Sequence, residues 1–242
     1  LILNFLIAGR KSRNDAGQAL CEALQALGPG FIKFGQALAT RADLIGPELA
    51  SGLVQLQDRL PPFSGKKAIK IIEDTTQRPL CELFTSFDEE AIAAASIAQV
   101  HKACLPDGRV VAVKILRPGI AKHMRRDVRF FRAMARLAEA VAPGLRRLKL
   151  VTAVQQFEQI SDIELDLRME AAAGTRLQEN MANDKGIRIP HIDLERTNSH
   201  MLVIEWIEGI RIDDVEALQK AGHDIAKITE AAATNFFNQL FR

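Results

Sequence analysis

The segment from Gln99 to Leu116 constrains the fold more than any other part of the sequence. Alternating residues lead into PDG, a tight-turn sequence. The apolar, β-branched run RVVAVKIL follows the turn directly. This pattern is typical of a β-hairpin. The second strand carries Lys114 among apolar neighbours, and a buried ammonium is costly unless an anion pairs with it. We therefore expect Lys114 to have an anionic partner; the alternative is a lysine that extends from a strand edge into water.

An alanine-rich loop lies in the stretch AIAAASIAQVHKA, residues 91–103. Ala93, Ala95, Ala98 and Val100 have the spacing of the three glycines and the valine in G-x-G-x-x-G-x-V, the loop that covers the phosphates in protein kinases. Glycine adopts positive φ readily, whereas alanine there costs on the order of 1 kcal/mol. Alanine in place of each of the three glycines predicts a stiffer loop, which would slow phosphoryl transfer to protein. Alternatively, the alanines only pack against a neighbouring helix.

Helical and strand-like patterns alternate along the chain. From about residue 15 to 60 the pattern is helical, with breaks at LGPG and LIGPEL, where glycine ends one helix and Pro29 or Pro47 begins the next. The remaining elements are a short helix and loop over 66–90, a helix over 120–182 interrupted at Pro143 and Gly144, two strands joined by a polar turn over 186–209, and a helix over 214–242. This order predicts an α+β fold.

The acidic candidates lie in QFEQISDIELDLRMEAAAG, residues 156–174. On one continuous helix Asp166 and Glu170 share a face, whereas Glu164 lies about 200° from Asp166. The three acids therefore cannot all serve one ligand. Glu170 is followed by three alanines, which permit close packing, and is the expected partner of Lys114. The alternative is a solvated acidic stripe.

Two stretches near the second strand pair bear on nucleotide chemistry. HIDLERTN, His191 to Asn198, matches H-R-D-L-x-x-x-N except at its second position. It precedes the apolar strand and follows a proline, so we do not interpret it as a catalytic loop. The strand that follows leads into Glu205 and Ile207, whose backbone groups could form a hinge that hydrogen-bonds the edge of an adenine. The alternative is that this segment is an ordinary buried strand.

Composition narrows the class of protein. The chain has 242 residues, of which 48% are hydrophobic, which is enough for a packed core. A net charge of +2 argues against nucleic-acid binding driven by bulk charge. The three dispersed cysteines predict neither a disulfide framework nor a zinc site and favour a reducing compartment.

The two ends of the sequence look internal to a longer protein. The opening LILNFLIAGRKSR has an apolar run too short for a bilayer span. The chain ends inside a helical pattern without a C-cap residue. We therefore expect continuation on both sides.

Four arginines form a basic stripe in the helix predicted after the hairpin. Arg125, Arg129, Arg132 and Arg136 follow i, i+4, i+7, i+11 spacing, with apolar residues at 128, 131 and 135 beside them. Such a stripe is usually a solvated face. A basic stripe edged by apolar residues also suits anionic lipid headgroups.

Taken together, these motifs resemble the UbiB family of atypical protein-kinase-like proteins, which is associated with ubiquinone (coenzyme Q) biosynthesis. The motif residues that carry the resemblance are Lys33, Phe34, Gly35 and Gln36 of K-x-G-Q, AAAS at Ala93 to Ser96, the nucleotide lysine Lys114, Glu164 and Asp166 of E-x-D, and Glu170 as partner of that lysine. Four motifs in the family order make the resemblance specific.

The resemblance implies a kinase-like small lobe, with an antiparallel sheet and an αC-like helix. It implies a helical K-x-G-Q extension over 1–65, the small lobe over 66–205, and a hinge with the first large-lobe helix over 206–242. The nucleotide-binding residues implied are Ala93, Ala94, Ala95, Ser96, Ala98, Val100, Lys114, Glu170, Glu205 and Ile207. The regulatory residues implied are Lys33, Gly35, Gln36, Glu164 and Asp166, with Lys33 pairing with Glu164 to hold the extension over the substrate face.

The expected cofactors are ATP or ADP, with Mg²⁺ in the full-length protein. The catalytic-loop acid and the metal-holding Asn and Asp of a kinase are expected after Arg242, so this segment alone should be inactive. The expected partners are adenine nucleotide, an anionic membrane surface or lipid ubiquinone precursors, and other proteins of ubiquinone biosynthesis, at the cytoplasmic face of a bacterial inner membrane. No nucleic acid is expected.

Three functions are compatible with these features. The first is an ATP-dependent atypical kinase or ATPase that supports ubiquinone biosynthesis. The second is a nucleotide-gated module that binds lipid or protein without phosphorylating anything. The third is a ring hydroxylase, which ranks last because the sequence has no flavin fingerprint or metal-ligand cluster.

Overall fold

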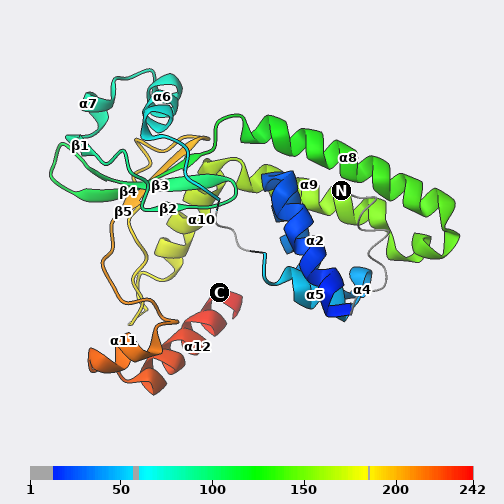
Figure 1. Ribbon diagram of the computed structural model, residues 1–242. Coiled ribbons are helices and arrows are strands. Elements are labelled where there is room, and N and C mark those ends of the chain that lie inside the picture. The colour runs from blue at the N-terminus through cyan, green and yellow to red at the C-terminus, as the bar shows by residue number, and fades with distance from the viewer. Residues whose placement is uncertain (1–12, 57–59, 185, 242) are drawn as a thin grey trace.

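The computed structural model describes residues 13–56, 60–184 and 186–241. Within these residues the strands form one five-stranded antiparallel sheet, which lies at one side of the molecule (Figure 1). Its strands are β1 (Ser86–Phe87), β2 (Ala93–Ala94), β3 (Ala98–Cys104), β4 (Val110–Leu116) and β5 (Met201–Glu205). The order is β1-β3-β4-β5, and β2 also pairs with β3. The predicted α+β class is confirmed.

The hairpin predicted over residues 99–116 is present as β3 and β4. Its register places Cys104 opposite Val110 and Val100 opposite Lys114. The turn closes because the amide of Leu105 donates to the carbonyl of Arg109 at 2.9 Å. Gly108 takes φ of 86° there, a left-handed conformation that favours glycine. β4 is therefore a central strand, with β5 on its other side.

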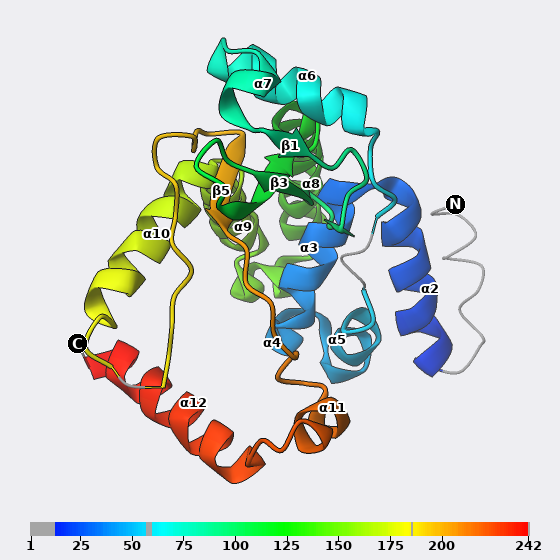
Figure 2. The same cartoon turned by 90° about the vertical axis from the view of Figure 1, so that its left-hand side faces the viewer.

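Helices cover both faces of the sheet (Figure 2). On one face, α6 (Gly65–Thr76) and α7 (Leu80–Leu83) pack on the side chains of Val113 and Ile115. On the other face, the buried side chains of Ala98 and Leu202 pack with those of α10 (Leu167–Asn180). Because side chains alternate along a strand, Lys114 points to the same face as α10.

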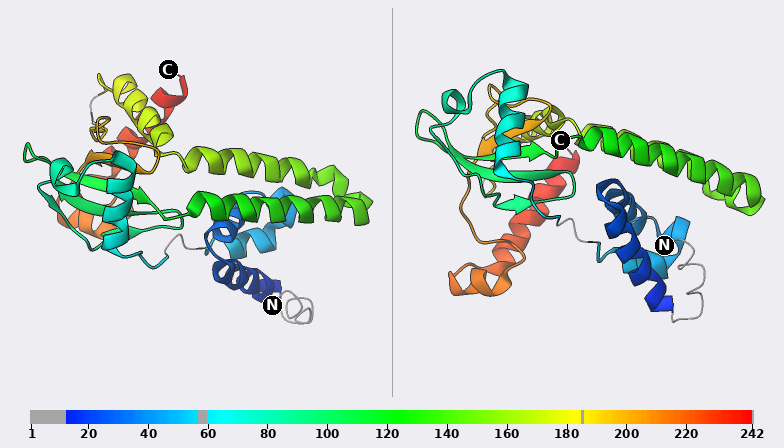
Figure 3. Two further views of the ribbon diagram at one scale, coloured as in Figure 1. Left: turned by 90° about the horizontal axis from the view of Figure 1, so that it is seen from above. Right: turned by 45° about the horizontal axis from the view of Figure 1, so that its top comes forward.

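A long helical hairpin extends from the sheet (Figure 3). It consists of α8 (Ile120–Val141), the 3₁₀ helix η1 (Pro143–Leu148) and α9 (Leu150–Glu164). Phe131 of α8 and Phe157 of α9 are buried between the two helices. The predicted interruption at Pro143 and Gly144 is confirmed, since η1 forms the tip of this hairpin.

The N-terminal helices lie against that hairpin. They are α2 (Arg13–Leu27), α3 (Pro29–Ala39), α4 (Ala42–Ile45) and α5 (Pro47–Leu53). Gly28 and Gly46 have φ of 110° and 86°, and a proline begins the next helix after each of them. The predicted breaks are therefore correct. The first residues assigned to the 1–65 extension lie outside the described residues, and the domain boundaries stay predictions.

Two sequence-based expectations about secondary structure are wrong. Residues 186–209 contain one strand, β5, and the other predicted strand is reduced to a single bridge between Ile192 and Ile204. The reason is a turn in which the Asp193 carboxylate accepts from the amide of Arg196 at 3.0 Å. The helix predicted over 120–182 also breaks a second time, at Leu165 and Asp166.

The last two helices lie at the end of an extended connection from β5 (Figure 1). They are α11 (Val215–Lys220) and α12 (Ile225–Phe241), which contact each other. α12 leaves Phe236, Phe237 and Phe241 largely exposed. The predicted helix over 214–242 is thus two helices, separated at Gly222, whose φ is 81°.

Candidate functional site

An ion pair between Lys114 and Glu170 marks the candidate site. Lys114 Nζ lies 2.9 Å from Glu170 Oε1 and 2.7 Å from Oε2. β4 carries the lysine and the first turn of α10 carries the acid, so the pair joins the sheet to the helix beneath it. The side chain of Lys114 is 29% exposed and that of Glu170 is 49% exposed. The pairing expected from the sequence is present, and the ammonium remains accessible from solvent.

A helix break before Asp166 explains how Glu164 and Glu170 pair with different lysines. Asp166 has extended backbone angles and is the N-cap of α10, where its carboxylate accepts from the Arg168 amide at 3.1 Å. Hydrogen bonding from the Arg168 side chain holds the pKa of Asp166 below its usual value. Asp166 and Glu170 thus both belong to α10, as its N-cap and as a residue of its first turn, and the break separates them from Glu164, which ends α9.

The alanine loop is the turn between β2 and β3. Ala93 pairs with Val100 in the sheet register, and the amide of Ala95 donates to the carbonyl of Ala98 at 2.8 Å. Ser96 and Ala98 are buried. Among the described non-glycine residues, positive φ occurs at Gln77 and Lys149 only. The loop thus closes without any left-handed alanine, and Val100 brings it directly beside Lys114 in the sheet.

The predicted hinge follows β5. The amide of Glu205 donates to the carbonyl of His191 at 2.8 Å. The His191 amide and the Arg188 guanidinium both bind the Glu205 carboxylate, and they hold the pKa of that carboxyl below its usual value. Ile207 is 44% exposed, and its amide makes no hydrogen bond to another described residue. The amide of Ile207 is therefore available to a ligand.

The K-x-G-Q motif lies in α3, where Lys33 pairs with Glu164 at the end of α9. The Nζ atom is 2.9 Å from Oε2 and 3.2 Å from Oε1. The lysine side chain is 20% exposed and the glutamate side chain is 38% exposed. The pairing that the resemblance implied is present, and it joins the N-terminal helices to the α8–α9 hairpin.

The other positions of the motif have distinct packing roles. The ring of Phe34 stacks on that of Phe131, with centroids 4.1 Å apart. A Cβ on Gly35 would lie 2.4 Å from Leu56 Cδ1 and 2.7 Å from Leu24 Cδ1, so any larger residue there would force the ends of these two buried side chains to move. The side chain of Gln36 makes no hydrogen bond to any described residue, and its predicted role remains a prediction.

Arg117 is a positioning residue that the sequence analysis missed. It follows β4, and its Nε donates to the carbonyl of Ala95 at 3.0 Å. Its Nη1 and Nη2 donate to the carbonyls of Pro61 and Leu60, at 3.0 and 3.3 Å. Arg117 therefore ties the alanine loop to the segment that follows the N-terminal helices. Local pattern could not reveal this, because all three acceptors are backbone carbonyls distant in sequence.

The basic stripe on α8 differs from the expectation. The apolar residues expected beside it, Val128, Phe131 and Ala135, are buried in the core. Arg132 pairs with Glu158 of α9. The apolar residues that α8 does expose are Phe130, Met134, Leu137 and Val141, on a different side of the helix from the arginines. The three apolar residues expected to edge the stripe therefore belong to the core, and a contact of the stripe with lipid headgroups stays a prediction.

In the described ranges, no group of three or more His, Cys, Asp or Glu side chains could hold a metal ion. The same ranges include no helix with the length and apolar character that a membrane span requires.

A small antiparallel sheet with a lysine on its central strand, paired to an acid on the adjacent helix, defines a kinase-like small lobe. Residues 55–242 match the family described as the ABC1 atypical kinase-like domain. The chain therefore belongs to the UbiB family of ABC1 atypical kinase-like proteins, as the resemblance of its motifs predicted.

Relatives support this assignment. The "Probable protein kinase UbiB" of Marinobacter nauticus is 45% identical over 226 residues, which are 93% of this chain and 41% of that relative. A protein of the same name from Aliivibrio fischeri is 40% identical over 239 residues, which are 98% of this chain and 44% of that relative. The chain thus spans less than half the length of these relatives.

A solved structure shows a similar fold. The complex of Rv3197 with erythromycin, from Mycobacterium tuberculosis, has a TM-score of 0.54 and 30% sequence identity. The match covers 74% of this chain and 45% of that chain. The kinase-like fold inferred from the sheet and the site agrees with this likeness.

Proposed function

We propose that this chain is the nucleotide-binding part of an ATP-dependent atypical kinase or ATPase that supports ubiquinone biosynthesis. The ion pair between Lys114 and Glu170 carries the proposal. An ammonium has three donor hydrogens, and Glu170 makes two contacts with it, at 2.9 and 2.7 Å. One donor direction is left for a phosphate oxygen, and Glu170 holds the ammonium in place for it.

The surroundings of the ion pair suit the rest of a nucleotide. The turn between Ala95 and Ala98 lies beside the lysine, on the strand paired to β4, and backbone in such a turn can approach phosphates closely. The exposed amide of Ile207 follows the neighbouring strand and suits an acceptor on the edge of an adenine. The two ends of the nucleotide thus have separate contacts.

We further propose that the N-terminal helices cover the face where a protein substrate would dock. Two contacts support this role: the Lys33–Glu164 pair and the stacking of Phe34 on Phe131. The residues that hold Mg²⁺ and the catalytic acid are expected in the remainder of the full-length protein. Turnover is therefore a property to measure on that protein.

ATP turnover by the full-length protein tests the proposal. We expect Mg²⁺-dependent hydrolysis or autophosphorylation, greater with liposomes of anionic lipid than without them. Lys114→Ala should abolish it, whereas Lys122→Ala, at an exposed position on α8 outside the pair, should not. If Lys114→Ala retains both nucleotide binding and turnover, the site assignment is wrong.

A second candidate function is a nucleotide-gated binding module. The observation that favours it is the solved relative Rv3197, which forms a complex with a small molecule, erythromycin. For this chain the module hypothesis predicts binding of an apolar ligand that changes with nucleotide, without turnover. Saturable nucleotide binding with no hydrolysis or phosphorylation in the full-length protein would favour the module.

A further inference from the structure

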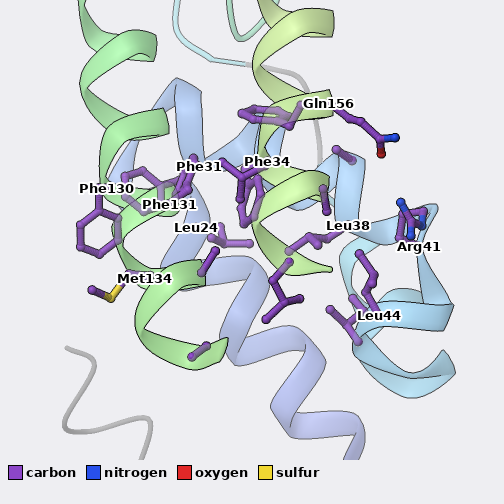
Figure 4. Close-up of a pocket in the computed structure, with 18 of the residues that line it drawn as sticks. Leu24, Phe31, Phe34, Leu38, Arg41, Leu44, Phe130, Phe131, Met134 and Gln156 are labelled. Atoms are coloured by element: carbon purple, nitrogen blue, oxygen red, sulfur yellow. The ribbon is translucent and has the colours of Figure 1, made fainter. Parts of the chain in front are cut away.

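A large apolar cavity lies between the N-terminal helices and the α8–α9 hairpin, away from the Lys114–Glu170 pair (Figure 4). Its volume is about 1020 Å³. Leu24, Phe31 and Phe34 line it from α2 and α3, and Phe131 and Met134 line it from α8 (Figure 4). α9 contributes a further wall. The cavity therefore has walls from both sides of the contact that Lys33 and Glu164 hold together.

Water is a poor occupant for such a cavity. An ordered water needs two to four polar partners, and almost every side chain in the wall is apolar. The cavity is partly open, and its wall leaves apolar side chains such as Phe130, Met134 and Ile160 exposed to solvent, which costs free energy that an apolar occupant would recover. Specific small-molecule sites are concave and mainly apolar, with a few polar groups that orient the ligand. An apolar ligand therefore fits this cavity better than water does.

The polar groups of the wall lie together and carry little net charge. Arg41 and Gln156 lie on the same side in Figure 4, opposite Phe130 and Met134. The Arg41 guanidinium is already paired with both oxygens of Asp43, at 2.8 Å each. Gln156 makes no hydrogen bond to a described residue, so its amide can both donate and accept. This end suits an uncharged polar head, and an anion would have to compete with Asp43.

We propose that the cavity binds an elongated, uncharged apolar molecule, an alkyl chain with a small neutral polar head. The chain lies among the phenylalanines, and the head contacts Gln156 beside the neutralised Arg41. The inference deepens the second candidate function, the binding module, by assigning the position of the site and the charge of its ligand. Its test uses no nucleotide, so it can fail while nucleotide binding at the Lys114–Glu170 site stands.

The test measures displacement of Nile red, a neutral fluorescent probe, from the full-length protein by linear alcohols from octanol to hexadecanol. Affinity should rise about fourfold for each added CH₂ while the chain fills the cavity, then reach a plateau. A plateau distinguishes a bounded cavity from adsorption on an open surface. A steady rise through the whole series overturns the proposal.

Two alanine substitutions locate the binding. Ala153 of α9 lines the cavity, and Ala140 of α8 is exposed outside it. Ala153→Phe should move the plateau to a shorter alcohol, whereas Ala140→Phe should leave it unchanged. Thermal unfolding of both variants checks the fold. If Ala153→Phe does not fold, the plateau of the unaltered protein and the comparison of head groups still decide the question.

The charge of the head group gives a separate comparison. Hexadecanol should displace the probe at a concentration at least tenfold lower than palmitate, and Gln156→Leu should reduce that difference. Tighter binding of palmitate, lost in Arg41→Gln, would show an anion site and overturn the proposal. A rise in probe affinity when Leu3, Phe5 and Leu6 are replaced by Ser would identify the chain's own N-terminal segment as the occupant, which also overturns it.

Discussion

Glu164 and Glu170 lie on opposite sides of one helix break and pair with different lysines. Glu164 ends α9 and holds Lys33 of the N-terminal helices, whereas Glu170 begins α10 and holds Lys114 of the sheet. Asp166 caps α10 between them. The contact that fixes the extension and the contact that prepares the proposed nucleotide site therefore share one short corner of the backbone. A movement of that corner would affect both.

Lys114→Ala should remove most of the stabilisation that nucleotide gives the full-length protein. Ligand at about 100 times its Kd stabilises the folded state by about 2.7 kcal/mol, and the lysine supplies the cationic contact to phosphate. Thermal unfolding with and without ATP measures the effect, and Lys122→Ala is the matched control. An equal ATP-dependent shift in Lys114→Ala and the unaltered protein would show that the lysine does not contact nucleotide.

Charge reversal of Lys33 or Glu164 should loosen the N-terminal helices. Each single reversal replaces a partly exposed attraction with a repulsion, so cleavage within residues 1–60 should become about two- to fivefold faster. The double exchange, Lys33→Glu with Glu164→Lys, should recover part of the protection. Limited proteolysis of the full-length protein measures the rates. The pair has no role in holding the extension if both single variants are cleaved at the unaltered rate.

Gly35→Ala should destabilise the packing of α3. The added methyl meets Leu24 and Leu56, both buried, and over-packing of this kind costs about 1–3 kcal/mol. Gly144→Ala is the control, because a Cβ at that position has no neighbour within 4 Å. Denaturant unfolding compares the two variants. Equal stabilities would mean that the close approach at Gly35 is not required.

Protonation of His101 should destabilise the sheet below about pH 6.5. Burial lowers the pKa of His101. Gln99 explains the preference for the neutral ring: its amide oxygen accepts from the Phe63 amide, so its nitrogen faces His101 Nε2 as a donor, 2.7 Å away. Nδ1 donates to the Asp88 carbonyl at 2.7 Å. A second proton on the ring would place two donors against each other.

The sign of this pH dependence follows from proton binding. Between the lowered folded-state pKa and the ordinary value, the unfolded chain binds more protons, so stability falls as the pH drops through that window. The slope from one group is at most about 1.4 kcal/mol per pH unit. His101→Phe should lose this slope whatever its overall stability. The free energy of unfolding of both proteins, measured between about pH 5 and pH 8, checks this prediction. An equal slope in His101→Phe and in the unaltered protein would show that His101 is not the group responsible.

Ala95→Gly should alter nucleotide handling if the alanine loop restrains phosphoryl transfer. The loop closes without positive φ, and glycine would add conformations that bring backbone amides over the phosphates. We expect a changed ATP to ADP affinity ratio and more autophosphorylation in the full-length protein. If the alanine only packs, the variant should instead lose about 0.5–1 kcal/mol of stability with the ratio unchanged.

The sequence by itself determined the local elements and the identity of the paired charges. Turn chemistry at PDG, proline after glycine at two helix starts, and apolar alternation around Lys114 each depend on neighbouring residues, so they could be interpreted without the fold. The family motifs then indicated Glu164 for Lys33 and Glu170 for Lys114. Both pairs are present.

Only the tertiary structure decided how the helices break, which residues between distant segments meet, and where the cavity lies. Asp166 favours an N-cap, and the break is fixed there by Leu167, which packs in the core and whose amide donates to the Ser199 carbonyl at 3.1 Å. Arg117 binds three carbonyls from two separate segments. The cavity likewise lies where side chains of α2, α3, α4, α8 and α9 come together and leave space between them. Contacts of this kind depend on the path of the whole chain, which no local pattern encodes.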